Sequence, residues 1–424
     1  MKFQVAGLSD VGIKRKDNQD AYLVDKKIPL FILCDGVGGH AAGATASSLC
    51  IQIFKDSVEK RADLIDAYRL EPSLKNRKGL AALLQNAALG ANYEIHQKGI
   101  RDSAKKGMAT TLVAILLLDD FALIAHVGDS RAYLLRAGVV HQLTEDHQFG
   151  IEMVKSGQWT EEQLYKSPHS NVLTRAVGMH PTLKVDTLQI EILTGDQFLL
   201  CSDGFYRYVN HEILKGFLPG EPAQIVPKLV DHAKKSGGED NITVISLNLE
   251  PKKAESSKAA IDILQKTELL TSVPLFRFMN FNEISKILSI AEVRPVSGGE
   301  TIVTEGDPSL HLFIIASGSV EVLRNNTRVT LRKKGDVIGE MGVFDKAPRA
   351  ATLKAETPVQ LIQIAQVELL NLFRKEQLIS LKFIWALNGV LTTRLRAATH
   401  ELTTHQHSAS SENTLSEWVP FSKD

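Results

Sequence analysis

The sequence predicts an α+β fold in two parts, in which helices layered on β-sheet are followed by a small β-roll with flanking helices. Three observations carry this prediction. Short apolar runs alternate with helical patterns before residue 250, glycines punctuate short strands from 293 to 364, and the polar segment PKKAESSKAA separates the two regions. We therefore predict a first domain over 1–250, a linker over 251–265, a second domain over 266–402 and a tail over 403–424.

The first part contains apolar runs of the length of buried strands, namely AYLV, LFILC, ATTLVAILLL, FALIAHVG, RAYLLRAG, QFLLCS and ITVISLNLE. Helical patterns at 41–60 and 79–98 lie between these runs. Because an amphipathic helix buries its apolar face against another element, we expect layers of helix on sheet.

The second part opens with a helical lead, LFRFMNFNEISKILSIAEV, and continues as short strands with turns at Gly298, Gly299, Gly306, Gly318 and Gly335. A long amphipathic helix is predicted over 376–402, with an apolar stripe of Leu378, Leu381, Ile384, Trp385, Leu391, Leu395 and Leu402. We expect this stripe to pack on the roll or to pair with a second copy of the chain. The segment HSASSENTLSEW is expected to be disordered at its start.

Composition and charge exclude several classes of protein. The 424 residues are 44% hydrophobic and contain 49 Lys+Arg and 49 Asp+Glu, so the basic surplus of a nucleic-acid binder is absent. Cys34, Cys50 and Cys201 lie in apolar surroundings without metal-ligand spacing, which indicates reduced thiols and a cytoplasmic location. Without a signal peptide or an apolar run of about 18 residues, we expect no membrane association.

Two apolar runs, PLFILCDG at 29–36 and DQFLLCSDG at 196–204, end in Asp-Gly. One such dipeptide is most simply a turn, but a carboxylate at the end of a buried strand costs free energy unless it is paired or bound to a cation. Comparable strand-end positions are held by Asp20, Asp35, Asp129, Asp203 and Asp240. We expect these carboxylates to converge on Mg²⁺ or Mn²⁺, with glycine allowing close approach of the backbone.

The order of these motifs resembles the metal-dependent protein serine/threonine phosphatases, the type 2C family, over 1–248. The matching stretches are GLSDVGIKRKDNQD, CDGVGGHAAG, GMATTLVAILL, AHVGDSRAYLL, LTEDHQ, NVLTRAVG, LLCSDGF and EDNITVI. The resemblance implies an α/β/β/α sandwich of two antiparallel sheets, two or three Mg²⁺ or Mn²⁺ ions at one end, and phosphorylated Ser/Thr proteins as substrates. The segment 143–178 matches the flap beside the site in this family.

The resemblance also implies roles for individual residues. Asp35 would bridge two ions, and the carbonyl group of Gly36 would bind one of them. Asp20 would hold an ion directly or through water.

Asp203 and Asp240 would complete the shell of the first ion, and Asp129 together with Asp203 would hold a third. Arg15 matches the phosphate-binding arginine, and its planar fork suits two phosphoryl oxygens. Val37 stands where eukaryotic members carry a histidine proposed as general acid, so we expect metal-bound water to protonate the leaving group.

The stretch GDVIGEMGVFDKAPRAAT at 335–352 resembles the phosphate-binding cassette of cyclic-nucleotide-binding domains, and the match extends from near 270 to near 400. Gly339 and the helical turn after it would present backbone N–H groups to a cyclic phosphate, as helix N-termini do for anions. Arg349 would supply the fixed positive charge, and Glu340 would accept a hydrogen bond from the ribose 2′-hydroxyl group.

Ala350 and Ala351 complete the predicted nucleotide site. Because Ala350 lacks the hydroxyl group that guanine-selective cassettes of the eukaryotic kinase kind place there, the sequence favours cyclic AMP. Thr392 or Thr393 is a candidate for contacting adenine from the long helix.

The sequence therefore predicts a cytoplasmic, metal-dependent protein phosphatase that cyclic AMP regulates, with activation as the expected effect. A homodimer through the C-terminal helix is one option for its assembly. The alternative is a pseudophosphatase scaffold that signals by binding phosphoprotein or nucleotide. A transcription regulator has little support, because too few residues follow 402 for a winged helix-turn-helix domain.

Overall fold

The structure is a computed structural model that describes residues 2–38, 40–250, 266–308, 310–340, 342 and 347–413. These residues belong to two compact units, Met1–Ile263 and Leu264–Asp424, and each unit has hydrophobic clusters of its own. The predicted linker 251–265 lies outside the described residues.

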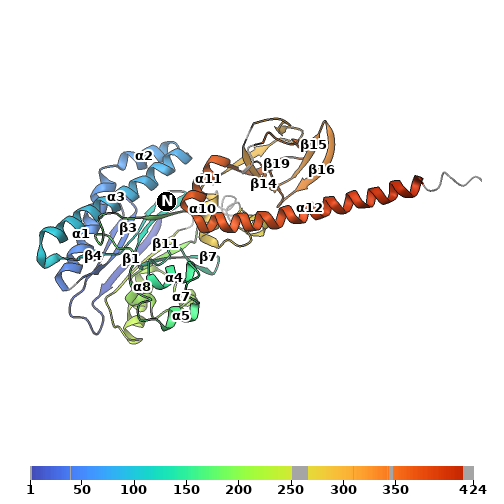
Figure 1. Ribbon diagram of the computed structural model, residues 1–424. Helices are drawn as coiled ribbons and strands as arrows, with labels where there is room; N and C mark the ends of the chain where they lie inside the picture. The colour runs from blue at the N-terminus through green and yellow to red at the C-terminus, as the bar shows by residue number, and fades with distance from the viewer. Residues whose placement is uncertain are drawn as a thin grey trace, which may run out of the picture. The chain divides into compact units, whose positions relative to one another are not determined.

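The strands of the first unit are β1 (Phe3–Asp10), β2 (Asp20–Asp25), β3 (Leu30–Val37), β4 (Ala109–Thr110), β5 (Leu112–Leu117), β6 (Phe121–Val127), β7 (Arg131–Arg136), β8 (Val139–Gln142), β9 (Asp186–Glu191), β10 (Gln197–Cys201) and β11 (Ile242–Leu249). They form two antiparallel sheets, ordered β1-β11-β10-β7-β8 and β2-β3-β5-β6-β9, with β4 paired to β3 (Figure 1). Phe3 of β1 and Phe31 of β3 meet edge to face, with ring centroids 5.6 Å apart, so the two sheets pack face to face.

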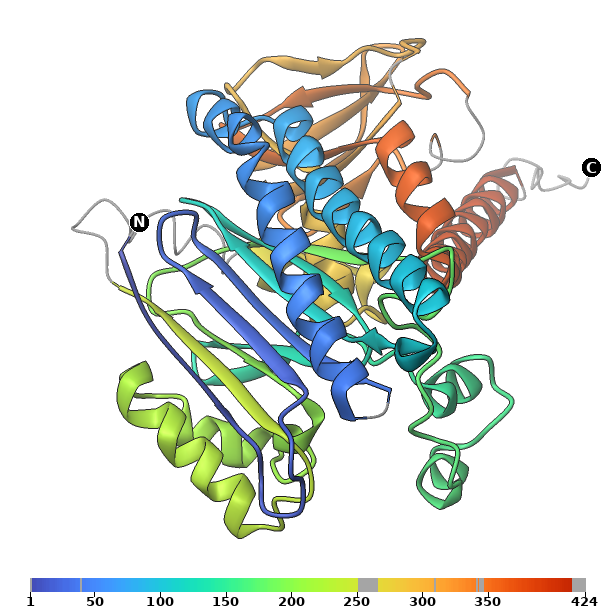
Figure 2. The same cartoon turned by 90° about the vertical axis from the view of Figure 1, so that its left-hand side faces the viewer.

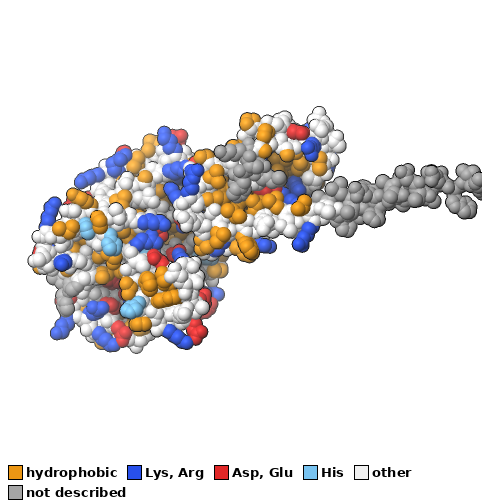
Figure 3. All heavy atoms as spheres, in the orientation of Figure 1, with side chains coloured by type: hydrophobic (Ala, Val, Ile, Leu, Met, Phe, Trp, Pro, Cys, Tyr) orange, Lys and Arg blue, Asp and Glu red, His pale blue; other side chains and the backbone are white. Residues whose placement is uncertain are grey.

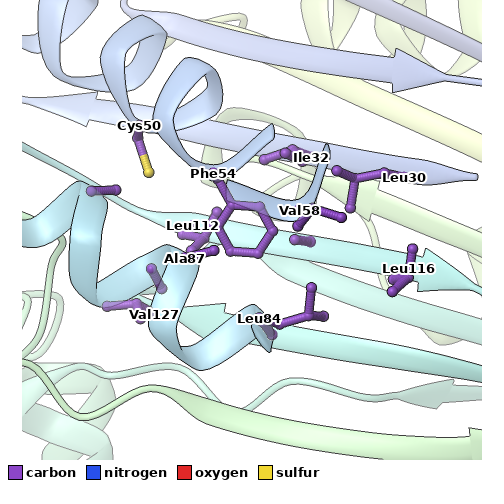
Figure 4. Close-up of a cluster of buried hydrophobic side chains, with 14 of the residues drawn as sticks. Leu30, Ile32, Cys50, Phe54, Val58, Leu84, Ala87, Leu112, Leu116 and Val127 are labelled. Atoms are coloured by element: carbon purple, nitrogen blue, oxygen red, sulfur yellow. The ribbon is translucent and has the colours of Figure 1, made fainter. Parts of the chain in front are cut away.

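The helices of this unit are α1 (His40–Glu59), α2 (Ala62–Leu70), α3 (Leu74–Arg101), α4 (Phe149–Lys155), α5 (Glu161–Lys166), α6 (Asp203–Tyr206), α7 (His211–Phe217) and α8 (Pro222–Lys235). Helices α1 and α3 cover one outer face of the sandwich (Figure 2). Phe54 of α1 lies among Ile32, Leu112 and Leu84 in the buried cluster between these helices and the sheet (Figure 4). Leu229 of α8 packs on the other sheet.

These layers confirm the predicted α/β/β/α sandwich. The short helices α4 and α5 lie within the segment 143–178 that was matched to a flap. Helix α5 begins at a capping box, in which the side chains of Thr160 and Gln163 each accept a hydrogen bond from the backbone N–H group of the other residue. A 3₁₀ turn (Ser103–Lys105) leads from α3 toward β4.

The second unit is a β-roll of two four-stranded antiparallel sheets, ordered β12-β19-β14-β17 and β13-β18-β15-β16. Its strands are β12 (Ala291–Val296), β13 (Thr301–Val303), β14 (His311–Ser317), β15 (Ser319–Arg324), β16 (Thr327–Lys333), β17 (Val337–Ile338), β18 (Thr352–Ala355) and β19 (Val359–Ala365). The flanking helical elements are a 3₁₀ turn (Pro274–Phe276), α10 (Phe281–Leu288), α11 (Gln366–Lys375) and α12 (Gln377–Asn413). Phe276, Phe373 and Phe383 join these helices to the core of the roll.

Helix α12 corrects one prediction and decides between two alternatives for its own packing. It continues to Asn413 instead of ending at 402, so the start of the tail is helical; the stretch between contains no glycine or proline to end a helix. Its buried side chains are Ile379, Phe383, Ala386 and Leu387. Most of the predicted stripe is exposed, at Leu378, Leu381, Ile384, Trp385 and Leu395, so it does not pack on the roll, and pairing with a second copy stays a prediction. Hydrophobic side chains gather over the first turns of α12 in Figure 3.

Among the described helices, none combines the length and the apolar character that a membrane span requires.

Candidate functional site

The predicted carboxylates are positioned by the ends of several strands. Asp20 opens β2 and is the register partner of Asp35 near the end of β3. Asp129 follows β6, Asp203 opens α6 and is separated from the end of β10 by one residue, and Asp240 lies just before β11. The strand ends that carry these residues lie at the same end of the two packed sheets. Residues from distant parts of the chain therefore come together.

Four of these five carboxylates line one cleft with a volume of about 780 Å³. Its lining includes the predicted residues Arg15, Asp35, Gly36, Asp129, Asp203 and Asp240. Asp20 is not part of that lining. Its Oδ2 accepts hydrogen bonds from Ser202 Oγ at 2.8 Å and Thr243 Oγ1 at 2.6 Å, which anchor it to the other sheet.

The carboxylates repel one another strongly. Burial, and then the nearby charges of Asp20 and Asp203, raise the pKa of Asp35 well above its usual range. Burial likewise raises the pKa of Asp20 and that of Asp129 to about 7, against hydrogen bonds that favour their ionised forms. The cluster is therefore a place where bound positive charge is stabilising.

Close packing explains why glycine follows both strand-end aspartates. Neither Gly36 nor Gly204 has a positive φ. A Cβ atom on Gly36 would collide with the backbone of Gly43 and lie 2.7 Å from the carbonyl oxygen of Gln19. A Cβ atom on Gly204 would collide with the carbonyl oxygen of Asn241. Both positions need glycine because another backbone segment approaches them.

The residues present fit hard divalent cations. The Oδ1 atom of Asp20 is buried without a hydrogen-bond partner, so one oxygen in the cluster is left for a further ligand. Within the described part of the chain, no group of three or more His, Cys, Asp or Glu side chains is arranged to hold a metal ion by itself. Mg²⁺ commonly binds one or two carboxylates and keeps several water molecules, which suits the carboxylates along this cleft.

Two arginines pair with the carboxylates of this cleft. Arg15 Nη2 lies 2.8 Å from Asp240 Oδ2. Arg207, which sequence reasoning missed, pairs with Asp203 Oδ2. Its position four residues after Asp203 was the available signal, because side chains at i and i+4 share a helix face.

Gln148 is a second residue that sequence reasoning missed. Its Nε2 atom donates to Asp129 Oδ2 at 2.8 Å, and Tyr206 Oη contacts the same oxygen at 3.4 Å. Gln148 also forms an isolated bridge with Leu173, which ties the flap segment to the position of Asp129. The motif LTEDHQ marked this segment, but no sequence pattern indicated which side chain would reach the carboxylate.

In the second unit, the residues predicted for the nucleotide line a pocket of about 230 Å³. They are Gly339, Glu340, Arg349, Ala350 and Ala351. Arg349 Nη2 donates to the carbonyl oxygen of His311 at 2.6 Å, while its Nε atom is buried without a partner. Gly339 has a φ of +85°, and a Cβ atom there would collide with the Arg349 guanidinium group. The turn after Gly339 lies outside the described residues, apart from Glu340 and Gly342.

Helix α12 contributes Arg394 to this pocket, and neither Thr392 nor Thr393 is among the lining residues. Arg394 pairs with the buried carboxylate of Glu340, and its Nη2 atom donates to the carbonyl oxygen of Val337 at 3.3 Å. The predicted ribose acceptor is thus already occupied by a guanidinium group.

Comparisons with known proteins match each part of the chain to a family. The family model described as Protein phosphatase 2C matches residues 13–234, and the model described as Cyclic nucleotide-binding domain matches residues 293–376. The chain is 34% identical over 232 residues to the serine/threonine phosphatase stp of Listeria innocua, covering 54% of this chain and 88% of that protein. It is 33% identical over 258 residues to protein phosphatase PhpP of Streptococcus pneumoniae, covering 59% of this chain and all of that protein.

A solved structure supports the same assignment. The crystal structure of the Mycobacterium tuberculosis serine/threonine phosphatase PstP/Ppp matches with a TM-score of 0.51 and 32% sequence identity, covering 59% of this chain and 99% of that one. Both resemblances predicted from the sequence are therefore confirmed. The Protein phosphatase 2C model spans more than half of the residues of this chain. The chain therefore belongs to the protein phosphatase 2C family, and it is a protein phosphatase that carries a cyclic nucleotide-binding domain.

Proposed function

We propose that this protein phosphatase removes phosphate from phosphoserine and phosphothreonine proteins with two or three Mn²⁺ or Mg²⁺ ions, and that cyclic AMP regulates it. One observation carries the proposal: Asp35, Asp129, Asp203 and Asp240 line one cleft, Asp20 lies beside Asp35, and the repulsion among these carboxylates favours bound cations. The relatives named as serine/threonine phosphatases support the substrate class.

The positions of the metal-site residues support the roles that the resemblance implies. Asp35 would bridge two ions, the Gly36 carbonyl group and Asp20 would assist in holding them, and Asp203 and Asp240 would bind the first ion. A third ion would take Asp129 with Asp203. Ions bound in this way activate a water molecule and stabilise charge during in-line phosphoryl transfer.

Arg15 is assigned to bind the phosphoryl group. Its side chain is 50% exposed and lines the cleft, so its planar guanidinium group can reach a substrate there. Val37 also lines the cleft and cannot donate a proton, so a water of the metal site is the proposed acid.

In the second unit, Arg349 is assigned to bind the cyclic phosphate and Glu340 to bind the ribose. The unpartnered Nε of Arg349 supports a ligand at this point. The absence of a hydroxyl group on Ala350, with Ala351 beside it, favours cyclic AMP over cyclic GMP. We propose that cyclic AMP raises phosphatase activity.

We further propose a cytoplasmic protein that dimerises through α12. Its domain limits are 1–250, 251–265 and 266–402, followed by a tail over 403–424 whose first residues continue α12. The three cysteines are free and buried, which supports a reducing compartment. The exposed apolar stripe of α12 supports a homodimer.

A direct assay tests the proposed function. The full chain is assayed on p-nitrophenyl phosphate and on a phosphothreonine peptide with Mn²⁺, with and without cyclic AMP. Mn²⁺-dependent hydrolysis that increases with cyclic AMP is expected. Absence of hydrolysis would favour the scaffold alternative, and unchanged activity at saturating nucleotide would refute the regulation.

A further inference from the structure

Arg207 directly follows α6, and its side chain turns back over the helix toward the cleft. Its backbone N–H group donates to the Asp203 carbonyl oxygen at 3.2 Å, and its guanidinium group pairs with Asp203 Oδ2. The Arg207 side chain is 44% exposed, whereas that of Asp203 is 12% exposed. Arg207 therefore forms part of the cleft wall from which a ligand can approach.

Arg15 repeats this arrangement on the neighbouring carboxylate. Asp240 Oδ1 accepts a hydrogen bond from the backbone N–H group of Asn241 at 2.9 Å, and Arg15 pairs with the remaining oxygen, Oδ2. The two arginines thus neutralise the two carboxylates that we assign to the first ion. A guanidinium group and a divalent cation on one carboxylate repel each other, so each arginine competes with the ion for its partner.

We infer that Arg207 is a second phosphate-binding residue, and that Arg207 and Arg15 turn to the substrate when cations take Asp203 and Asp240. This inference rests on the proposed function and adds a residue to it. A phosphomonoester carries nearly two negative charges at neutral pH and three acceptor oxygens, which suits two guanidinium groups. Both arginines line the same cleft of about 780 Å³.

The test measures binding of inorganic phosphate and of Mn²⁺ by calorimetry on the full chain. The variants are Arg207→Ala and Arg207→Lys, and the control is Lys235→Ala, which removes a surface cation of α8 paired with Asp231. With Mn²⁺ present, Arg207→Ala should weaken phosphate binding roughly tenfold, the effect of losing one charge-assisted hydrogen bond. Arg207→Lys should fall between wild type and Arg207→Ala, because an ammonium group keeps the charge but loses the fork.

The metal-free protein supplies the contrast. In EDTA, where Arg207 is held by Asp203, Arg207→Ala and wild type should bind phosphate equally. Mn²⁺ should bind Arg207→Ala about two- to fivefold more tightly, because its competitor is gone. Circular dichroism melting verifies that each variant is folded.

The outcomes separate the inference from the proposed function. Normal Mn²⁺ binding with unchanged phosphate affinity in Arg207→Ala overturns the inference alone. Equal weakening of phosphate binding with and without Mn²⁺ also overturns it, because a merely structural role predicts that pattern. A wild-type chain that binds no Mn²⁺ and hydrolyses no phosphopeptide overturns the proposed function as well.

Discussion

Asp20 and Asp35 face each other in register on the adjacent antiparallel strands β2 and β3. Two carboxylates directly opposite on neighbouring strands repel each other, and the burial of Asp35 makes that repulsion stronger. A fold that keeps such a pair sacrifices stability at this point of the sheet. The bound cations of the proposed site would recover that stability.

The first prediction follows from this pair. Asp35→Asn should abolish hydrolysis of p-nitrophenyl phosphate in Mn²⁺, while the metal-free variant melts no earlier than wild type, because a repelling charge is removed. Asp231→Asn, on the surface of α8, is the matched control and should keep full activity. Near-normal turnover by Asp35→Asn at saturating Mn²⁺ would refute the bridging role.

The second prediction concerns metal removal. Because a ligand that binds only the folded state stabilises it by mass action, Mn²⁺ at 100 times its Kd should add about 2.7 kcal/mol to the free energy of unfolding. Calorimetric melting with Mn²⁺ and with EDTA measures this difference at the unfolding transition of the first unit. EDTA should also silence the phosphatase, and the melting shift should vanish in Asp35→Asn. An identical melting temperature in both conditions would count against a cation site.

The third prediction concerns the nucleotide pocket. Arg349→Ala should weaken cyclic AMP binding by at least about tenfold, the effect of losing a charge-assisted hydrogen bond. Arg374→Ala, at the exposed end of α11, serves as control and should bind normally. Calorimetric titration with cyclic AMP and cyclic GMP gives both affinities. Undiminished cyclic AMP binding by Arg349→Ala, or tighter binding of cyclic GMP by wild type, would contradict the assignment.

The fourth prediction concerns assembly through α12. Leu381 and Trp385 are 62% and 67% exposed on the face of the helix that points away from its own core. Leu381→Glu should convert a dimer into a monomer, as measured by light scattering at micromolar concentration. Leu70→Glu, at an 87% exposed position of α2, should leave the dimer intact. A wild-type monomer, with and without nucleotide, would rule out this interface.

The fifth prediction concerns stability away from the sites. Arg136 and Asp196 form a buried ion pair with an N–O distance of 2.6 Å, and Arg136 Nη2 also donates to the Glu191 carbonyl oxygen. Asp196→Ala leaves a buried guanidinium group without its carboxylate, so the free energy of unfolding should fall by about 3–5 kcal/mol. Denaturant titration measures this loss. A change below about 0.5 kcal/mol, the effect typical of a surface substitution, would contradict the expectation.

Local patterns in the sequence were sufficient for the sandwich and the roll. Apolar runs such as LFILC mark strands because a buried strand needs apolar side chains on both faces, and β3 covers that run. Of the two alternatives for the stripe of α12, packing on the roll does not hold for most of its residues, because the helix has apolar residues on two faces and a different set faces the core. Periodicity alone could not tell Phe383, which is buried, from Trp385, which is exposed.

In the two sites, likewise, the sequence predicted some residues and missed others. Asp35 and Asp203 were found from sequence because Asp-Gly after an apolar run is unusual enough to notice when it is repeated. Arg207 and Gln148 were not found, because surface arginines and glutamines are common. Their importance lies in which carboxylate they reach, and only the packing of the flap and of α6 decides that.

In the proposed nucleotide site, the ion pair between Arg394 and Glu340 would make nucleotide binding an exchange of partners. A ribose hydroxyl group that takes Glu340 must first dislodge a guanidinium group carried by α12. The measured affinity for a nucleotide would then be reduced by the free energy needed to break the ion pair between Arg394 and Glu340. A substitution at Arg394 would remove this competitor of the ribose and, in the same step, the ion pair that joins the pocket to α12.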